Sequence, residues 1–495
     1  SPFVFEKCEV ALFDPEAWDL FHDFFTLVEL EAESSKGLDP AWAGELLANL
    51  NEVANIYDDE KRATWKQARD LIKPLYKRVN GTMAHELSAI GHAHIDTAWL
   101  WPLAETYRKC ERTFSSQLAY MQEYPQYKFA CSQAYQYSII KENNPELYAR
   151  IKKAVKAGQF VPVGGTWIEP DCNMPSGESF IRQVIHGNRY WRSRFPDVTP
   201  PRYLFLPDTF GFPASLPQII RGCGITTFVF NKLWWNESNP PAFSAFTWRG
   251  IDGSEVLSYL TPGMEYNATM TPPELRKGDT NHRAKDPTSP SEWLQPFGYG
   301  NGGGGPTRDM ILARDFAEEA LALPTIEFTR VDEFCERLHE RAGKLAENGT
   351  PLPVWPEAEL YLERHRGTYT TQAWIKKMNR RSEESLRLAE CRAFAGPEAP
   401  DAAAREALVA RLDEAWKLVL LNQFHDILPG SSIKAVYDDA RVQYGRVYKQ
   451  LLDGIDEVAS RAWTRAVSGD SGCAGVFNPA STTRSGVERI GGVLR

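Results

Sequence analysis

The sequence predicts an α/β fold that is built largely on parallel strands. Between about residue 85 and residue 300, short runs of apolar, β-branched and aromatic residues alternate with helix-like segments. Because helices of this kind connect parallel strands, the alternation favours a barrel or an open sheet. The predicted strands are 87–94, 127–134, 160–163, 203–206, 226–230 and 255–260. Predicted helices between them include 103–123, 144–157 and 178–192.

Mainly helical segments are predicted before and after this region. In residues 15–79, and again from 308 to about 465, apolar residues recur at helical spacing. Residues 261–306 are rich in Pro, Gly and polar residues, which is typical of a long loop. The loop ends in Gly300-Asn301-Gly-Gly-Gly-Gly305-Pro306. A loop of this length inside a compact domain is usually functional, so we expect it to contribute to a site.

The composition describes a globular protein with more than one domain. The chain has 495 residues, 43% hydrophobic and 12% aromatic, which favours about two to four domains. Its net charge of −9 argues against nucleic acid as the main partner, because phosphate binding needs a basic surface. No apolar run approaches a membrane span, and the N-terminus lacks the features of a signal peptide. The eight cysteines are scattered singly, as reduced thiols are, so we expect a cytoplasmic protein.

The first predicted strand ends in a row of three potential metal ligands, His92, His94 and Asp96, with Trp99 just beyond. In a strand, residues two apart point to the same face, so these three side chains would lie together. Imidazole nitrogens and a carboxylate at this spacing suit Zn²⁺ or a similar divalent ion. The alternative is a pair of core histidines at a strand end.

Two later positions carry the same kind of chemistry. Asp208 follows the predicted strand 203–206 and precedes Gly and Pro, so it could also be only a turn or helix-cap residue. His425 stands at the end of the predicted helix 402–421, where the helix dipole alone would favour a histidine. Asp208 lies after a strand, where α/β folds place active-site residues, and His425 lies at a helix terminus. Neither residue alone shows whether the protein has a catalytic or metal-binding function.

Two segments combine aromatic and polar groups in a way that suits sugar rings, although both could equally be corners of the core. Aromatic faces accept the apolar faces of a sugar, and carboxylates accept hydrogen bonds from its hydroxyl groups. The segments are Gly164-Gly-Thr-Trp167-Ile-Glu169-Pro-Asp171 and Glu363-Arg-His365-Arg-Gly-Thr-Tyr369.

Together these pieces resemble glycoside hydrolase family 38, the zinc-dependent retaining α-mannosidases, and especially its cytosolic and bacterial branch. The matching motifs span about residues 85 to 435 and occur in the family's order. They are GHAHIDTAWLWPLAET, CSQAYQY, GGTWIEPDCNMPSGESFIRQ, LPDTFGFPASLPQI, FGYGNGGGGPT, ERHRGTYTTQA and NQFHDILPGSS. The resemblance implies a distorted β/α barrel of seven parallel strands, followed by a three-helix bundle and then by β-sandwich domains.

On this basis the chain divides into four predicted parts. They are an N-terminal helical segment at 1–80, a β/α-barrel catalytic domain at 81–306, a helical bundle domain at 307–465 and the start of a β-sandwich domain at 466–495. The last part holds only about the first strand of such a domain, so the chain looks truncated there.

The resemblance also selects among the candidate ligands. It implies a metal site formed by His94, Asp96, Asp208 and His425, and leaves out His92. Zn²⁺ suits two histidines and two carboxylates, and Co²⁺ or another divalent ion is an alternative. Further expected substrate contacts are Trp99, Phe210, Glu169 and Asp171. The implied partners are mannose-containing oligosaccharides, and a homo-oligomer is conceivable.

The implied chemistry is that of a retaining glycosidase, and one position departs from it. Asp208 is the implied nucleophile that forms a covalent glycosyl-enzyme. The family's acid/base residue is an Asp in the Gly-rich loop, where this chain has Asn301. An amide cannot act as a general acid or base, so this sequence is expected to be an impaired variant, engineered or natural. Rescue by a neighbour such as Asp309 is a further alternative.

Two other functions are compatible with the same residues. One is a related zinc hydrolase such as a carbohydrate deacetylase, which would release acetate rather than mannose. The other is a non-catalytic carbohydrate-binding protein, which would stay inactive after an Asn301→Asp change.

Overall fold

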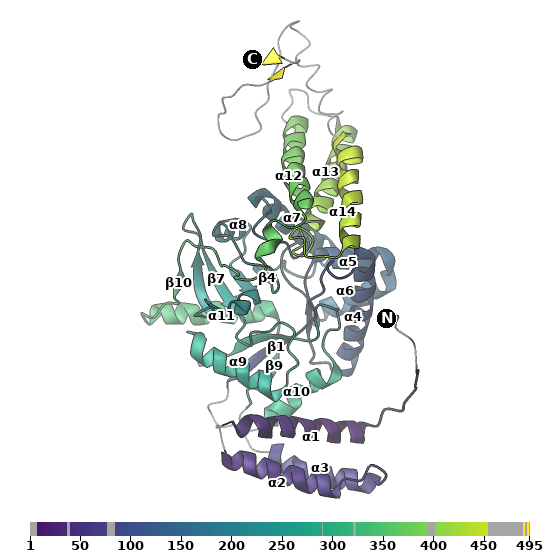
Figure 1. Cartoon of the computed structure of the whole chain (residues 1–495), viewed down its shortest axis with the longest axis vertical. Coiled ribbons are helices and arrows are strands. Elements are labelled where there is room, and N and C mark those ends of the chain that lie inside the picture. The colour runs from purple at the N-terminus through teal and green to yellow at the C-terminus, as the bar shows by residue number, and fades with distance from the viewer. Residues whose placement is uncertain are drawn as a thin grey trace.

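The computed structural model describes residues 7–36, 40–76, 85–289, 291–319, 323–394, 401–453, 489–490 and 493–494. Three tiers follow one another along the long axis (Figure 1). Helices α1, α2 and α3 form one end, a mixed α/β body lies in the middle, and α12, α13 and α14 stand at the other end.

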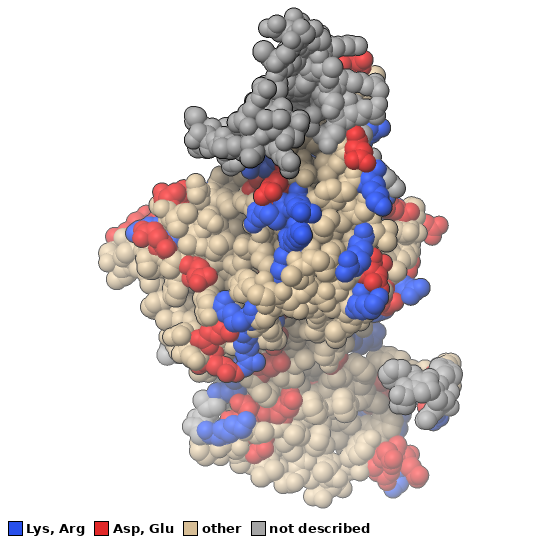
Figure 2. All heavy atoms as spheres, turned by 45° about the horizontal axis from the view of Figure 1, so that its top comes forward, with Lys and Arg blue, Asp and Glu red and all other residues tan. Residues whose placement is uncertain are grey.

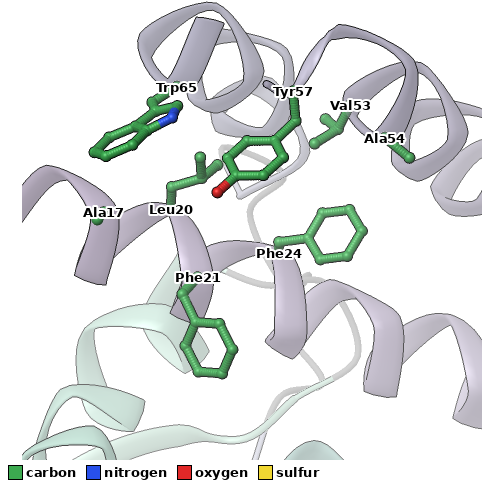
Figure 3. Close-up of a pocket in the computed structure, with 8 residues that line it drawn as sticks. All are labelled: Ala17, Leu20, Phe21, Phe24, Val53, Ala54, Tyr57 and Trp65. Carbon is green, nitrogen blue, oxygen red and sulfur yellow. The ribbon is translucent and has the colours of Figure 1, made fainter. Parts of the chain in front are cut away.

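The three N-terminal helices are α1 (Pro15–Ser34), α2 (Pro40–Ile56) and α3 (Arg62–Tyr76). The carboxylate of Asp14 accepts hydrogen bonds from the first amides of α1, which fixes where this helix begins. Leu27 and Leu30 of α1 are buried, and α1 packs on α9 and α10 of the body. A hollow of about 400 Å³ remains between α1, α2 and α3 (Figure 3). It is lined by Ala17, Leu20, Phe21, Phe24, Val53, Ala54, Tyr57 and Trp65.

The strands of the body form two five-stranded sheets. In the first sheet, every pairing is parallel, in the order β3-β2-β1-β8 with β9 also paired to β1. Its strands are β1 (Glu86–His92), β2 (Phe129–Cys131), β3 (Phe160–Pro162), β8 (Trp293–Phe297) and β9 (Thr325–Phe328). In the second sheet, the order is β10-β6-β7-β5-β4, and only β6 and β7 pair antiparallel. Its strands are β4 (Tyr203–Leu206), β5 (Thr227–Phe230), β6 (Ala245–Arg249), β7 (Glu255–Leu260) and β10 (Val354–Trp355).

The two sheets enclose one apolar core. Ile90 of β1, Val161 of β3, Phe205 of β4, Val229 of β5 and Leu294 of β8 belong to the same buried cluster. The predicted α/β fold with mainly parallel strands is therefore confirmed. The seven parallel strands expected in one barrel are not confirmed, because the described strands of the body form two five-stranded sheets, one of which includes an antiparallel pair.

Helices cover the outer faces of the sheets (Figure 1). They are α4 (Leu103–Glu123), α5 (Ala134–Asn143), α6 (Pro145–Lys156), α7 (Gly177–Arg194), α8 (Leu216–Gly222), α9 (Pro272–Lys285), α10 (Arg308–Glu319) and α11 (Val331–Glu347). Phe334 and Leu338 of α11 close the core between the sheets. Since β9 and β10 pair with the sheets, the α/β body continues past residue 306, where the sequence had suggested that it ends.

The continuous loop expected over residues 261–306 is wrong, because this segment contains α9 and β8. Two of the prolines in this segment, Pro272 and Pro273, stand at the first positions of α9, where proline is well tolerated. Gly278 is needed inside this helix, because a Cβ there would lie 2.1 Å from the ring of Trp293.

Beyond the body, α12 (Ala373–Phe394), α13 (Ala402–Leu421) and α14 (Lys434–Arg446) pack against one another, and α13 also packs on α7. A π-helical turn, Val447–Leu452, continues α14. The short strands β11 (Arg489–Ile490) and β12 (Val493–Leu494) pair antiparallel. The rest of the predicted β-domain, from residue 466, lies outside the described residues.

Within the described residues, we find no helix that is both long and apolar enough to cross a membrane. The face of the molecule shown in Figure 2 carries both acidic and basic side chains, separated by wide uncharged areas.

Candidate active site

Four side chains from three distant segments meet in the interior. His94 and Asp96 follow β1, Asp208 follows β4, and His425 follows α13. Each offers one ligand atom, and these four atoms lie within 4.8 Å of one another. The predicted convergence of the four residues is thus observed. The carboxyl ends of the parallel strands β1 and β4 place three of them on one rim, as α/β folds do for active sites.

The cluster has the geometry of a cation site. Nε2 of His94 lies 2.9 Å from Oδ1 of Asp96 and 3.7 Å from Oδ2 of Asp208. Nε2 of His425 lies 3.3 Å and 3.4 Å from the same two oxygens. Nε2 of His425 is buried yet makes no well-aligned hydrogen bond. Two imidazole nitrogens and two carboxylate oxygens that face one point form a donor set that fits a divalent ion.

The backbone between the two ligands that follow β1 is held by Gln136 of α5 and by Gln133, the residue before this helix. The amide groups of Gln133 and Gln136 both donate to the carbonyl oxygen of Ile95, at 3.0 Å and 2.7 Å. The hydroxyl of Thr97 donates to the side-chain oxygen of Gln133. These bonds fix the direction in which His94 and Asp96 point.

Glu169 contacts Nδ1 of both histidines of the cluster. Its carbonyl oxygen accepts a hydrogen bond of 3.0 Å from Nδ1 of His425, so the lone pair of the neutral ring must be on Nε2. Its carboxylate oxygen Oε2 lies 3.3 Å from Nδ1 of His94, and Ser132 donates to Oε1. Glu169 is buried and contacts the Nδ1 atoms, while the Nε2 atoms face the cluster, so it stands behind the ligands.

We expect Glu169→Gln to weaken metal binding by about 10- to 100-fold, because an outer carboxylate raises the basicity of the histidine that it contacts. Competition with a chelating indicator measures this affinity. Glu292→Gln is the matched control, since Glu292 is also a buried carboxylate but pairs with Arg337 and Arg341 outside the cluster. Equal affinities of Glu169→Gln and the parent chain would contradict this role.

His92 lies apart from the cluster. The family resemblance had likewise left it out of the implied metal site. Its Nδ1 lies 3.1 Å from the carbonyl oxygen of Ala130, and its ring packs edge-on against Phe205. Burial lowers the pKa of His92 to about 4, so the ring is neutral. His92 is therefore a core histidine, which was the alternative to a metal ligand at this position of the motif.

The second oxygen of Asp208 is held by two residues that the sequence analysis did not identify. Oδ1 accepts a hydrogen bond of 2.5 Å from Nζ of Lys232 and one of 2.5 Å from the hydroxyl of Tyr266. Lys232 lies in the 3₁₀ helix η1 (Lys232–Trp235), directly after β5. Burial would raise the pKa of Asp208, but Lys232 and the two histidines hold it well below its usual range. The carboxylate is therefore ionised, with Oδ2 toward the cluster and Oδ1 on the other side.

Asp426 is a further carboxyl group that the sequence analysis did not single out. Burial, with Asp96 nearby, raises its pKa to about 7. Its Oδ2 lies 4.0 Å from Nε2 of His425 and its Oδ1 accepts from Ser431. A buried carboxyl group with such a pKa is a candidate for contact with a polar ligand.

The Gly-rich loop lies on the same rim. Asn301 and Gly302 form isolated bridges with Ile95, which stands between two of the clustered residues. Gly300 has no room for a side chain, because a Cβ there would meet Asn267 and would lie 3.1 Å from Cβ of His94. Asn301 adopts a left-handed backbone conformation, with φ of 53°. Nζ of Lys109 donates to the carbonyl oxygen of Gly302 and holds the loop in place.

Asp309 stands elsewhere. It follows the loop at the start of α10 and accepts a hydrogen bond from Thr307. With Phe21 and His22 of α1 it lines a hollow between the N-terminal helices and the body. This position does not support the idea that Asp309 substitutes for residue 301.

The remaining expected substrate contacts differ in their surroundings. Phe210 packs beside the cluster, with its ring 5.7 Å from that of His425 and 4.7 Å from that of His365. Trp99 is partly exposed and packs edge-on against Trp101. Asp171 is buried, and its carboxylate accepts the backbone amides of Asn173 and Met174, so it shapes a turn.

We expect metal affinity to rise with pH. Burial lowers the pKa of His425, but the close carboxylates of Asp208 and Asp96 outweigh this and raise it from 6.5 to about 10 in the metal-free protein. Below pH 6.5 the proton fully stabilises the metal-free fold, and this contribution is lost as the pH rises through about 10. A metal must displace the same proton. Calorimetric titration with metal in two buffers of different ionisation enthalpy should show proton release, and a pH-independent affinity would contradict the cluster's role.

Comparison with known proteins agrees with this fold and identifies the family. Two family descriptions match the chain: "Glycosyl hydrolases family 38 N-terminal domain" over residues 84–358, and "Alpha mannosidase middle domain" over residues 363–461. A mouse protein named alpha-mannosidase 2C1 is 38% identical over 89% of this chain, and alpha-mannosidase G of Dictyostelium discoideum is 39% identical over 91%. This chain covers 41% and 40% of those two relatives, so it spans about two fifths of their length.

A solved structure of an alpha-mannosidase from Enterococcus faecalis V583 matches 78% of this chain with a TM-score of 0.62. Its sequence is 20% identical, and the match covers 43% of that chain, so it supports the fold alone. Together, the family matches place the chain among the glycoside hydrolase families. The chain belongs to glycosyl hydrolase family 38.

Proposed function

We propose that this chain carries the catalytic part of a metal-dependent, retaining exo-α-mannosidase that removes terminal α-mannose from oligosaccharides. The observation that carries the proposal is the convergence of His94, Asp96, Asp208 and His425 in one buried cluster. The relatives that are named alpha-mannosidases support the substrate class.

The proposed metal ligands are these four residues, and Zn²⁺ is the ion that their two nitrogens and two oxygens suit best. When bound, such an ion would act as a Lewis acid that holds and polarises sugar hydroxyl groups. Co²⁺ or another divalent cation is an alternative occupant. Phe210 and Trp99 are proposed to line the sugar site. Glu169 is proposed to position the two histidines. Asp171 is proposed to stabilise a turn at the site.

Asp208 is the proposed nucleophile. Its Oδ1, held by Lys232 and Tyr266, would attack the anomeric carbon while the bond to the leaving oxygen breaks. The leaving oxygen then needs a proton, and a water must later lose one to release the sugar from Asp208. In this family position 301 is expected to exchange both protons. The amide of Asn301 cannot do so, and the chain is therefore proposed to be an acid/base-impaired variant.

The proposed domain division follows the predicted one, with one changed boundary. The helical segment 1–80 precedes the catalytic α/β domain that begins at 81, and we extend this domain past residue 306 to include β9, α11 and β10. The helical domain then runs to about 465, followed by the start of a β-sandwich domain at 466–495. The cysteines in the described residues are free, which is compatible with the expected cytoplasmic location.

Hydrolysis of an aryl α-mannoside by the Asn301→Asp form, with and without a chelator, tests the proposal. We expect mannose release that the chelator abolishes and added Zn²⁺ restores. Release of acetate from an acetylated sugar, with no mannose from the mannoside, would favour a carbohydrate deacetylase. Binding of mannosides without any turnover by the Asn301→Asp form would favour a carbohydrate-binding protein.

A further inference from the structure

A second cavity opens on the rim that carries the metal-ligand cluster. It has a volume of about 600 Å³, within the range of about 300–1,000 Å³ that is usual for ligand sites. Residues at the carboxyl ends of β5 and β7, Phe230 and Leu260, form its floor. The loop 236–243 and the segment 355–361 form its walls. Nothing in the proposed mechanism uses this cavity.

The cavity is separated from the catalytic cluster by a single 3₁₀ turn. In a 3₁₀ helix, residues three apart lie on the same side. Lys232 and Trp235 of η1 therefore share one side, where Lys232 binds Asp208 and lies 3.4 Å from the centre of the Trp235 ring. Leu233 and Asn236 share another side, and both line the cavity. The same turn therefore contributes Lys232 to the catalytic cluster and Leu233 and Asn236 to the lining of the cavity.

A second connection runs through the segment after β10. The backbone of Leu360 pairs with that of Phe212, two residues after Phe210, through two hydrogen bonds of 2.9 Å. The side chains of Leu360 and Tyr361 line the cavity. A ligand bound next to Phe210 would therefore have this cavity beside it on the same rim.

The lining has the chemistry of a carbohydrate site. Three of the aromatic residues that line it remain substantially exposed: Phe243 at 42%, Trp355 at 38% and Tyr361 at 44%. Ser238 and Asn239 offer a hydroxyl and an amide at the edge. Among the described residues, no carboxylate, ammonium or guanidinium group lines the cavity, which favours a neutral ligand. By contrast, the cavity at the opposite, amino ends of β4 and β5 is lined by Arg202, Arg330 and Asp332 among others.

The walls are fixed before any ligand binds. The carboxylate of Glu363 accepts hydrogen bonds from the backbone amides of three successive residues of the loop 236–243. The carbonyl oxygen of Pro241 accepts a bond of 2.8 Å from Nζ of Lys285. The guanidinium group of Arg366 covers one face of the Tyr361 ring at 3.5 Å. Such preorganisation lowers the cost of ordering the site when a ligand binds.

We propose that this cavity binds the sugar units on the aglycone side of a neutral α-linked manno-oligosaccharide whose terminal mannose occupies the catalytic cluster. The inference rests on the proposed mannosidase function and adds to it a preference for chains over isolated mannose. The exposed rings would stack on sugar faces, and Ser238 and Asn239 would bind hydroxyl groups.

Calorimetric titration of the Zn²⁺-loaded chain tests this, because Asn301 should keep the ligands intact during the measurement. The ligands are methyl α-mannoside and α-linked mannotriose. We expect mannotriose to bind more tightly, by roughly 2- to 12-fold for each stacked ring. Tyr361→Ala and Phe243→Ala should each reduce this gain and leave the affinity for methyl α-mannoside unchanged. Phe25→Ala, which removes an equally exposed ring from α1, should change neither affinity.

Each other outcome has a defined meaning. Equal binding of the two ligands, or a gain that survives in both cavity variants, would overturn the assignment of this cavity while leaving the mannosidase proposal intact. If neither ligand binds and the Asn301→Asp form fails to hydrolyse an aryl α-mannoside, the mannosidase proposal itself is overturned. If Tyr361→Ala unfolds the chain, Phe243→Ala decides the question, since the Phe243 side chain has no hydrogen bond to lose.

Discussion

The Asn301→Asp chain should hydrolyse unactivated α-mannosides at least about 10²- to 10⁴-fold faster than the present sequence, because general acid–base help typically contributes that factor. The Gly-rich loop lies beside Ile95, between His94 and Asp96, so residue 301 stands on the rim where the leaving oxygen would be. Rates of mannose release from an α-mannobioside measure the gain. Asp309→Asn in the Asn301→Asp background is the matched control and should have little effect, because Asp309 faces α1.

The same change predicts which intermediate accumulates. A substrate with a good leaving group needs no proton, so the Asn301 chain should still form the glycosyl ester on Asp208. The following step lacks its base, and the adduct should persist. Intact-mass analysis after mixing with an activated α-mannoside would detect one added mannosyl group. No rate gain in Asn301→Asp, together with no adduct on Asp208 in the Asn301 chain, would contradict both assigned roles.

We also expect the side-chain carbons of residues 208 and 301 to lie roughly 5–6 Å apart, the spacing of the two catalytic carboxyl groups in retaining glycosidases.

Replacement of both histidines in the cluster should abolish the metal-dependent gain in stability and the metal-dependent activity. In the His94→Ala, His425→Ala variant, only two carboxylates of the donor set remain, and neither would hold a borderline ion tightly. The parent chain should gain about 2.7 kcal/mol of stability at a metal concentration one hundred times the Kd. The double variant should show no such gain and no chelator-sensitive activity in the Asn301→Asp background.

Differential scanning calorimetry with and without Zn²⁺ measures this difference. The double variant His22→Ala, His339→Ala is the control, since it removes two imidazoles that lie outside the cluster. A full metal-dependent increase in the Tm of the His94→Ala, His425→Ala variant would mean that the ion binds elsewhere. Loss of the increase in the control variant as well would point to a general effect of destabilisation.

The end of β4 was predicted from the sequence at its observed residue, Leu206, because an apolar run followed by a turn-forming segment is a local signal, whereas the end of β1 was predicted at 94, two residues beyond its observed end at His92. Such a run precedes His94 and Asp96, and another precedes Asp208. The strand–helix alternation likewise predicted mainly parallel pairing. The choice of His94 over His92, however, required the family pattern, because both face the interior and both are buried.

The contacts of Asp208 could not be predicted, because they join segments that are not linked by any local pattern. Lys232 lies 24 residues from Asp208 along the chain and Tyr266 lies 58 residues away. A lysine after a strand is normally solvated, so its burial beside a carboxylate has no sequence signature. Helix α9 was missed for a related reason, since its interior glycine makes sense only once Trp293 packs against it.

Anomalous diffraction from crystals of this chain grown with Zn²⁺ tests the central claim most directly. Data on either side of the zinc absorption edge should give one strong peak in the cluster, about 2.0–2.2 Å from Nε2 of His94, Nε2 of His425 and one carboxylate oxygen each of Asp96 and Asp208. At saturating Zn²⁺, a cluster without such a peak, or a peak that only one or two of these four residues coordinate, would contradict the account.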